Sequence, residues 1–158
     1  MFTTSTRRRI VFSAIAGTAV VATMAGLSGV ATAGTLPTDV PTTAMTITNN
    51  TGHALTIDDA NIPYGYWIAA PRESLAPGQT EIITGASNNR APVFPISISY
   101  QMDTNTIVKF VSTNDYMGAN TDGSNVSGPG ASTYTVQSTI DTGAPNVNAS
   151  YVLSPLVN

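Results

Sequence analysis

Aromatic side chains are the residues of this chain best suited to chemistry at a surface, and three of them stand together. Tyr64, Tyr66 and Trp67 form a Tyr-Gly-Tyr-Trp segment with Gly65, whereas Tyr116 lies in a stretch rich in Asn, Asp and Gly. Tyrosine and tryptophan rings combine an apolar body with a polar tip, which suits a boundary between apolar and aqueous surroundings. We therefore predict a ligand-binding surface formed by Tyr64, Tyr66, Trp67 and Tyr116.

Trp67 has two possible roles, in the core or in contact with a ligand. Small β-domains need aromatic residues in their cores, because each aromatic side chain buries about 150–250 Å². Successive side chains of a strand point to opposite faces, so a Trp67 that faces the core places Tyr66 on the surface. The sequence leaves both roles of Trp67 open.

Residue types for metal binding and catalysis are scarce. The chain has one histidine, His53, and no cysteine, so it lacks the donors of a conventional zinc or iron site. Residues 120–123 have some character of a calcium loop, but that register places Gly118 at the first ligand and Pro129 at the bidentate acid. No G-x-S-x-G sequence marks a nucleophile. We expect no metal, no cofactor and no enzymatic activity.

Short alternating apolar and polar runs must position these side chains. Gly, Pro, Asn or Asp separates nearly all of the runs, and no segment keeps helical periodicity for three turns. This pattern predicts an all-β fold, a single antiparallel β-sandwich of about eight short strands. The strands are expected near residues 45–48, 54–57, 64–69, 80–84, 93–102, 107–111, 132–140 and 149–153.

Two connections stand out between the predicted strands. Asn49-Asn50-Thr51-Gly52 is a turn sequence between the first two runs, which we therefore expect to pair as a β-hairpin. The stretch from Ser112 to Ala131 is poor in strand-forming residues, and we expect it to be the largest loop.

The N-terminal segment has the pattern of an export signal. Arg7, Arg8 and Arg9 precede an apolar stretch from residue 10 to 30, and Ala31-Thr32-Ala33 fits a cleavage site. The arginines fit a twin-arginine signal and an ordinary charged n-region equally well, so the export route stays open. A membrane anchor is the alternative, since a spanning helix needs about 20 residues.

We favour cleavage because glycine, serine and threonine dilute the apolar stretch and the small-residue site follows at once. The predicted organisation is a signal peptide at residues 1–33, a flexible lead-in at 34–43 and a β-sandwich domain at 44–158. The protein is then secreted, with cleavage after Ala33.

The charge of the exported part limits its partners. Its basic residues are Arg72, Arg90 and Lys109, against nine acidic residues, so its net charge is −6. A surface of this sign repels phosphate backbones and anionic lipid headgroups. We therefore expect no nucleic-acid partner, and any membrane target should be neutral or zwitterionic.

Five short segments follow one another along the exported part: Ile47-Thr48-Asn49-Asn50-Thr51, Gly65-Tyr66-Trp67, Pro71 with Leu75-Ala76-Pro77-Gly78, Ile98-Ser99-Tyr100, and Asn114-Asp115-Tyr116-Met117-Gly118-Ala119-Asn120. In these residues and in their order the chain resembles the aegerolysin family of small acidic β-sandwich proteins.

The resemblance implies a lipid-recognising protein that binds sphingolipid-type headgroups. In some members of the family it also implies delivery of a separate pore-forming protein. The expected partners are therefore a neutral or zwitterionic membrane surface and, as in those members, a separate pore-forming protein. A secreted, non-enzymatic β-sandwich that binds a carbohydrate or a protein at the cell surface is the alternative function.

Overall fold

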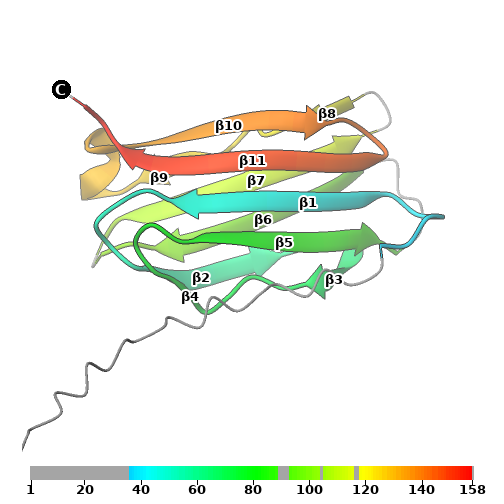
Figure 1. Ribbon diagram of the computed structural model, residues 1–158, viewed down its shortest axis with the longest axis horizontal. Helices are drawn as coiled ribbons and strands as arrows, with labels where there is room; N and C mark the ends of the chain where they lie inside the picture. The colour runs from blue at the N-terminus through cyan, green and yellow to red at the C-terminus, as the bar shows by residue number, and fades with distance from the viewer. Residues whose placement is uncertain (1–35, 89–92, 104, 116–117, 158) are drawn as a thin grey trace, which may run out of the picture.

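The computed structural model describes residues 36–88, 93–103, 105–115 and 118–157, which form a two-layered β-domain (Figure 1). The predicted all-β sandwich is confirmed, whereas the predicted export signal lies outside the described residues. Within those ranges the chain forms one short 3-10 helix, η1 (Pro129–Ser132), and eleven strands: β1 (Thr42–Asn49), β2 (Leu55–Asn61), β3 (Gly65–Ala69), β4 (Ser74–Leu75), β5 (Thr80–Ser87), β6 (Val93–Gln101), β7 (Ile107–Asp115), β8 (Gly118–Asn120), β9 (Asn125–Ser127), β10 (Tyr134–Thr142) and β11 (Asn146–Pro155).

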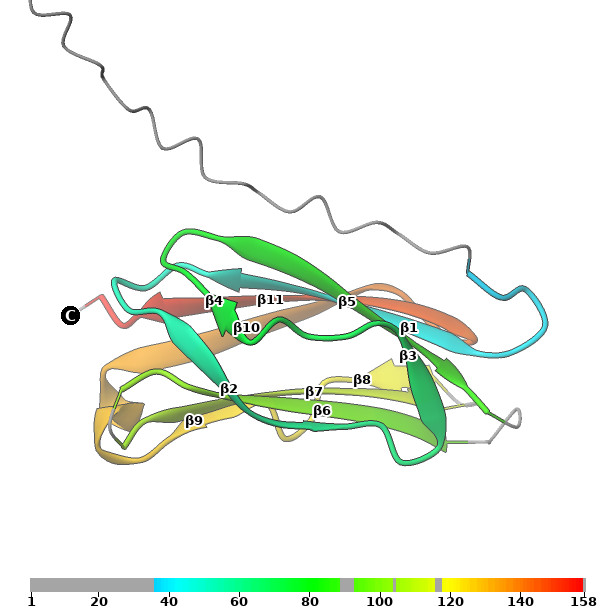
Figure 2. The same cartoon turned by 90° about the horizontal axis from the view of Figure 1, so that it is seen from below.

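The strands are divided between two sheets. Sheet A has the order β10-β11-β1-β5-β3, and sheet B has the order β4-β2-β6-β7-β8, with β9 paired to β7. All pairs are antiparallel except β1 and β11, which run parallel. Figure 2 shows the sheets as two layers, with β3 at one end of the sandwich.

Side-chain alternation in β1 shows how the sequence forms these layers. Met45 and Ile47 are fully buried between the sheets, whereas Thr46 and Thr48 lie on the outer face and are partly exposed. Threonine and isoleucine are β-branched, which suits both faces of a pleated strand. The two-residue period therefore assigns each side chain of this strand to core or solvent.

Aromatic rings form the centre of the core. Tyr100 and Phe110 lie edge to face with their centroids 6.3 Å apart, and Phe110 meets Tyr151 in the same manner at 5.6 Å. Edge-to-face pairs of this kind stabilise a core by about 0.5–1.5 kcal/mol beyond the area that they bury. These three rings form a continuous contact from β6 through β7 to β11. The chain has no cysteine, so the core is stabilised by such packing and not by disulfides.

The predicted hairpin of the first two strands is wrong, because β1 belongs to sheet A and β2 to sheet B. The connection between them crosses from one layer to the other. Asn49, fully buried, holds this crossing: its Nδ2 donates to the carbonyls of His53 (2.8 Å) and Leu75 (3.1 Å), and its Oδ1 accepts from Thr51. The turn residues were correctly placed, but a crossover and a hairpin share the same turn composition.

The predicted long loop from Ser112 to Ala131 is also wrong. β7 continues to Asp115, and β8, β9 and most of η1 follow within the same stretch. Polar residues here occupy ladder positions: Asn114 pairs with Ala119, and Asn125 pairs with Lys109. The eight predicted strands correspond to the eight longest, and the structure adds the short strands β4, β8 and β9.

β6 contains a proline without losing its place in the sheet. The ladder between β2 and β6 runs from Gln101 only to Ser97, so Pro95 lies beyond the part of β6 that has two neighbours. Pro95 still pairs with Thr113 of β7. A residue without an N–H group is tolerated in a strand where one side carries no partner.

Candidate functional site

One end of the sandwich gathers the ends of several strands. β2 and β5 end there, β3 and β6 begin there, and the β7–β8 hairpin turns there. Val93 pairs with Asp115, and Gly65 pairs with Ser87. The two sheets meet where the ring of Phe94 in β6 lies against Gly65 of β3. We call this region the aromatic end.

Three large side chains at the aromatic end are exposed. Tyr64 is 57 % exposed, Tyr66 is 47 % exposed and Val93 is 42 % exposed. We call these three residues the tyrosine rim: Tyr64 and Tyr66 lie just before and within β3 of sheet A, and Val93 begins β6 of sheet B. Other aromatic and aliphatic side chains of the domain are buried in the core. The rim side chains instead present apolar surface to solvent.

Gly65 allows the two tyrosines to occupy this position. A Cβ atom at residue 65 would collide with the ring of Phe94 and with the carbonyl oxygen of Ala86, so only glycine lets the chain pass this closely. The N–H group of Asn88 donates to the carbonyl of Tyr64 at 2.9 Å and fixes the chain just before β3. Tyr64 and Tyr66 therefore precede and follow Gly65, whose backbone is held tightly against the core.

Trp67 faces the other way from Tyr66. It pairs with Gly85 of β5, whose Cβ position points at Ile62 and Ile96 between the sheets, and the Trp67 side chain packs against the core while partly exposed. Tyr66 pairs with Ala86 and points outward. Of the four predicted binding residues, the structure thus places Tyr64 and Tyr66 on the surface and Trp67 against the core.

Tyr116, the fourth predicted residue, lies outside the described residues. Its neighbours Asp115 and Gly118 pair with each other in the β7–β8 hairpin, at the aromatic end. Sequence reasoning missed Val93 as a rim residue. The signal was present, because Phe94 and Ile96 alternate with it and face the core.

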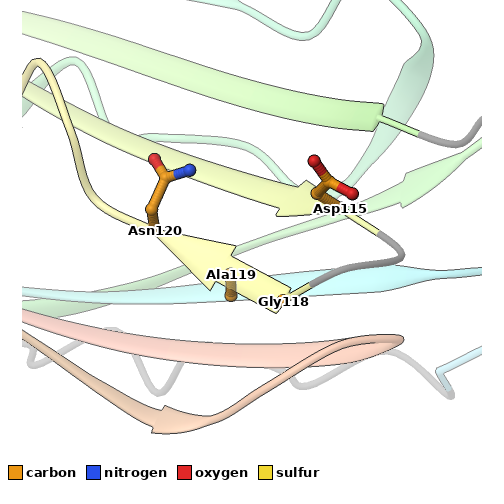
Figure 3. A pocket seen from close by; sticks show the side chains of 4 residues that line it. All are labelled: Asp115, Gly118, Ala119 and Asn120. Atoms are coloured by element: carbon orange, nitrogen blue, oxygen red, sulfur yellow. The ribbon is translucent and has the colours of Figure 1, made fainter.

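A shallow pocket of about 200 Å³ lies beside the rim on the β7–β8 hairpin. Figure 3 shows it between the side chains of Asp115 and Asn120, with Gly118 and Ala119 along the second strand. Asp115, which lines this pocket, is the ladder partner of Val93. A carboxylate and an amide can accept and donate hydrogen bonds to a polar group that lies against this end.

The described residues of the aromatic end carry few charges. Residues 61–66, 87–88, 93–95, 113–115 and 118–120, which are the described residues around the rim, contain Asp115 as an acid and no lysine or arginine. This described part of the surface therefore provides no cation for the anionic headgroup of an acidic lipid.

A buried carboxylate lies nearer to the opposite end and has a structural role. Glu81 of β5 is 3 % exposed, and its two oxygens accept hydrogen bonds from the Tyr100 hydroxyl and from the Arg72 N–H group (3.1 Å). Burial, and then the hydrogen bond to the Glu81 carboxylate, raises the pKa of the Tyr100 phenol. Sequence analysis did not foresee this contact, which joins β5 of sheet A to β6 of sheet B.

Two other kinds of site are absent from the described residues. No group of three or more His, Cys, Asp or Glu side chains there could hold a metal ion. Nor does any helix in that part of the chain have the length and apolar character needed to cross a membrane.

Comparison with solved structures places this fold beside a lipid-binding protein. The crystal structure of the lipid binding protein Nakanori is similar to this chain with a TM-score of 0.60 and 13 % sequence identity, over 73 % of this chain and 71 % of that one. Fifteen solved chains match the structure in all. No family model matches the sequence, and no curated protein matches it. At this identity the likeness concerns the fold.

Proposed function

We propose that this chain is a secreted, non-enzymatic, aegerolysin-like module that binds the surface of a membrane through its tyrosine rim. The observation that carries the proposal is the exposure of Tyr64, Tyr66 and Val93 together at one end of the sandwich. Two further observations support the same function. Five short segments of the sequence resemble aegerolysins in their residues and in their order along the chain, and the fold is similar to that of a lipid-binding protein.

The chemistry of the rim suits the interfacial layer of a bilayer. Tyrosine rings place their apolar edges among acyl chains while their hydroxyl groups remain among headgroups, and valine adds apolar area. Fully burying one such side chain contributes about 1.5–3 kcal/mol, and rim residues are already about half-buried in the domain. The rim therefore contributes on the order of 3 kcal/mol, which gives weak and reversible binding.

Selectivity must then come from the headgroup. The exported sequence carries a net charge of −6. Anionic membranes are repelled by such a surface, whereas a neutral or zwitterionic headgroup is not. We propose that a sphingolipid-type membrane is the target, and that a separate pore-forming protein acts after binding where lysis occurs.

Vesicle co-sedimentation and a glycan array, performed on the same purified domain, test this function. We expect the domain to sediment with vesicles of sphingomyelin, cholesterol and phosphatidylcholine, and not with phosphatidylserine vesicles at low salt. Binding to glycans without binding to vesicles would contradict the proposal and favour the carbohydrate-binding alternative. Preference for phosphatidylserine would contradict the assignment of a neutral target.

A further inference from the structure

The side chain of Asn114 joins the two sheets at the aromatic end. It is 4 % exposed, and its Nδ2 donates to the carbonyl oxygens of Thr42 (3.0 Å) and Pro145 (2.7 Å). Asn114 belongs to β7 of sheet B, whereas Thr42 begins β1 of sheet A and Pro145 lies in the β10–β11 connection. One amide therefore fixes the end of sheet B to two segments of sheet A.

The neighbours of Asn114 connect this contact to the rim. Asn114 is the ladder partner of Phe94, whose ring supports Gly65 between the two rim tyrosines. The next residue, Asp115, is the ladder partner of Val93. The spacing between Val93 on sheet B and Tyr66 on sheet A thus depends on how the two sheets are held together at this point.

We infer that Asn114 is a positioning residue for membrane binding: its buried amide fixes the strand ends of sheet B and sheet A that carry the tyrosine rim relative to one another. The inference rests on the proposed function, because it assigns Asn114 to the same surface. The Asn114 side chain itself is buried and contacts no lipid.

Asn49 provides a matched control at the other end of the sandwich. It is also a buried asparagine, and its Nδ2 also donates to two main-chain carbonyls, those of His53 and Leu75. Removing either amide takes one hydrogen bond from each of two carbonyl oxygens, so both variants should be less stable. The Pro145 carbonyl still accepts from the Thr42 N–H group, and the His53 carbonyl still accepts from the Thr51 hydroxyl, so the two losses are comparable. Only Asn114 lies next to the rim, so only its loss should disturb the binding surface.

The experiment compares Asn114→Ala, Asn49→Ala and the wild-type domain, each well below its melting temperature. We expect both variants to melt several degrees lower. We expect Asn114→Ala alone to bind sphingomyelin-cholesterol vesicles about tenfold or more weakly, with faster amide hydrogen exchange in residues 62–66 and 93–95. If Asn114→Ala does not fold, Asn114→Ser, which keeps one hydroxyl donor, replaces it and should give a smaller loss in the same direction.

Equal binding by wild type and a folded Asn114 variant would overturn the inference and leave the proposed function standing. Equal weakening by Asn49→Ala would also overturn it, because the effect would then follow stability rather than position. A wild-type domain that binds no vesicles would overturn the proposed function, and the inference with it.

Discussion

The residues of the Tyr64–Trp67 segment have different roles because strand geometry separates them. Tyr66 points outward beside Ala86, whereas Trp67 points toward the core beside Gly85. The sequence predicted this opposition but left the direction open. The structure shows that Trp67 faces the core. Its ladder partner Gly85 faces the space between the sheets, where Ile62 and Ile96 occupy the position that a side chain at residue 85 would take.

Replacing Trp67 with alanine should mainly affect stability. Its side chain packs against the core, so we expect Trp67→Ala to lower the free energy of unfolding by about 3 kcal/mol. Tyr66→Ala, on the exposed side of the same strand, should cost less than about 1 kcal/mol. Urea unfolding measures both values. A loss below about 1 kcal/mol for Trp67→Ala would contradict the packing of the tryptophan against the core.

Two buried tyrosines should make the domain sensitive to alkali. Burial raises the pKa of Tyr151, and burial together with the Glu81 hydrogen bond raises that of Tyr100. The phenols of the unfolded chain ionise near pH 10, as free tyrosine does, so above about pH 10 the unfolded state loses protons that the native state retains. The free energy of unfolding therefore falls as pH rises through this range.

Urea unfolding between about pH 8 and pH 11 tests this dependence. Each buried phenol should lower the free energy of unfolding by up to about 1.4 kcal/mol for each pH unit above 10. In Tyr151→Phe, the free energy of unfolding should fall less steeply with pH, by up to about 1.4 kcal/mol for each pH unit, because one buried phenol is absent. An identical slope in the variant and the wild type would show that Tyr151 does not contribute.

At the scale of elements, the sequence predicted strands better than their partners. All eight longer strands were placed, because apolar alternation is local. The pairing of β1 with β11 joins residues about a hundred positions apart, and no local pattern shows it. β2 belongs to the opposite sheet, and the hydrogen bond from Asn49 to Leu75 at this crossing joins residues 26 positions apart, which no local pattern shows either.

The candidate site was predictable to a similar degree. Tyr64 and Tyr66 were predicted as binding residues from their type, and the structure leaves both side chains exposed. Val93 and Asn114 were not singled out, because their place at the aromatic end depends on which strands meet there. The ladder between β6 and β7 brings both residues to the same end of sheet B.

The position of β3 should depend on the small size of Gly65. We expect Gly65→Ala to lower the free energy of unfolding by about 1–3 kcal/mol, because the added methyl group meets Phe94 and Ala86. Gly52→Ala is the matched control, since nothing lies within 4 Å of its Cβ position. Thermal unfolding compares the two. Equal effects would show that β3 does not pack against Phe94 as closely as described.

The whole domain should bind membranes without perforating them. Crossing a hydrocarbon core of about 30 Å with strands takes about 9–11 residues each, apolar on alternate positions. β10 presents Thr135, Gln137 and Thr139 on its outer side, in register with Ser154, Val152 and Ser150 of β11, and its other side packs toward the core. Withdrawing such a strand would also empty the core.

Dye release from sphingomyelin-containing and plain phosphatidylcholine vesicles measures this property. We expect no release above background from either kind of vesicle with the isolated domain at micromolar concentration. Efficient release without a second protein would make the domain a pore-former on its own and would contradict the accessory role.

The central claim is that the tyrosine rim is the membrane-binding surface, and vesicle-binding affinity of three proteins tests it most directly. These are the wild type, the double variant Tyr64→Ser/Tyr66→Ser, and Ile82→Ser, whose side chain is 50 % exposed on the outer face of β5. The account predicts that the double variant binds sphingomyelin-cholesterol vesicles at least about tenfold more weakly, a loss of about 1.4 kcal/mol, while Ile82→Ser binds like the wild type. Undiminished binding by the folded double variant, or an equal loss in Ile82→Ser, would contradict it.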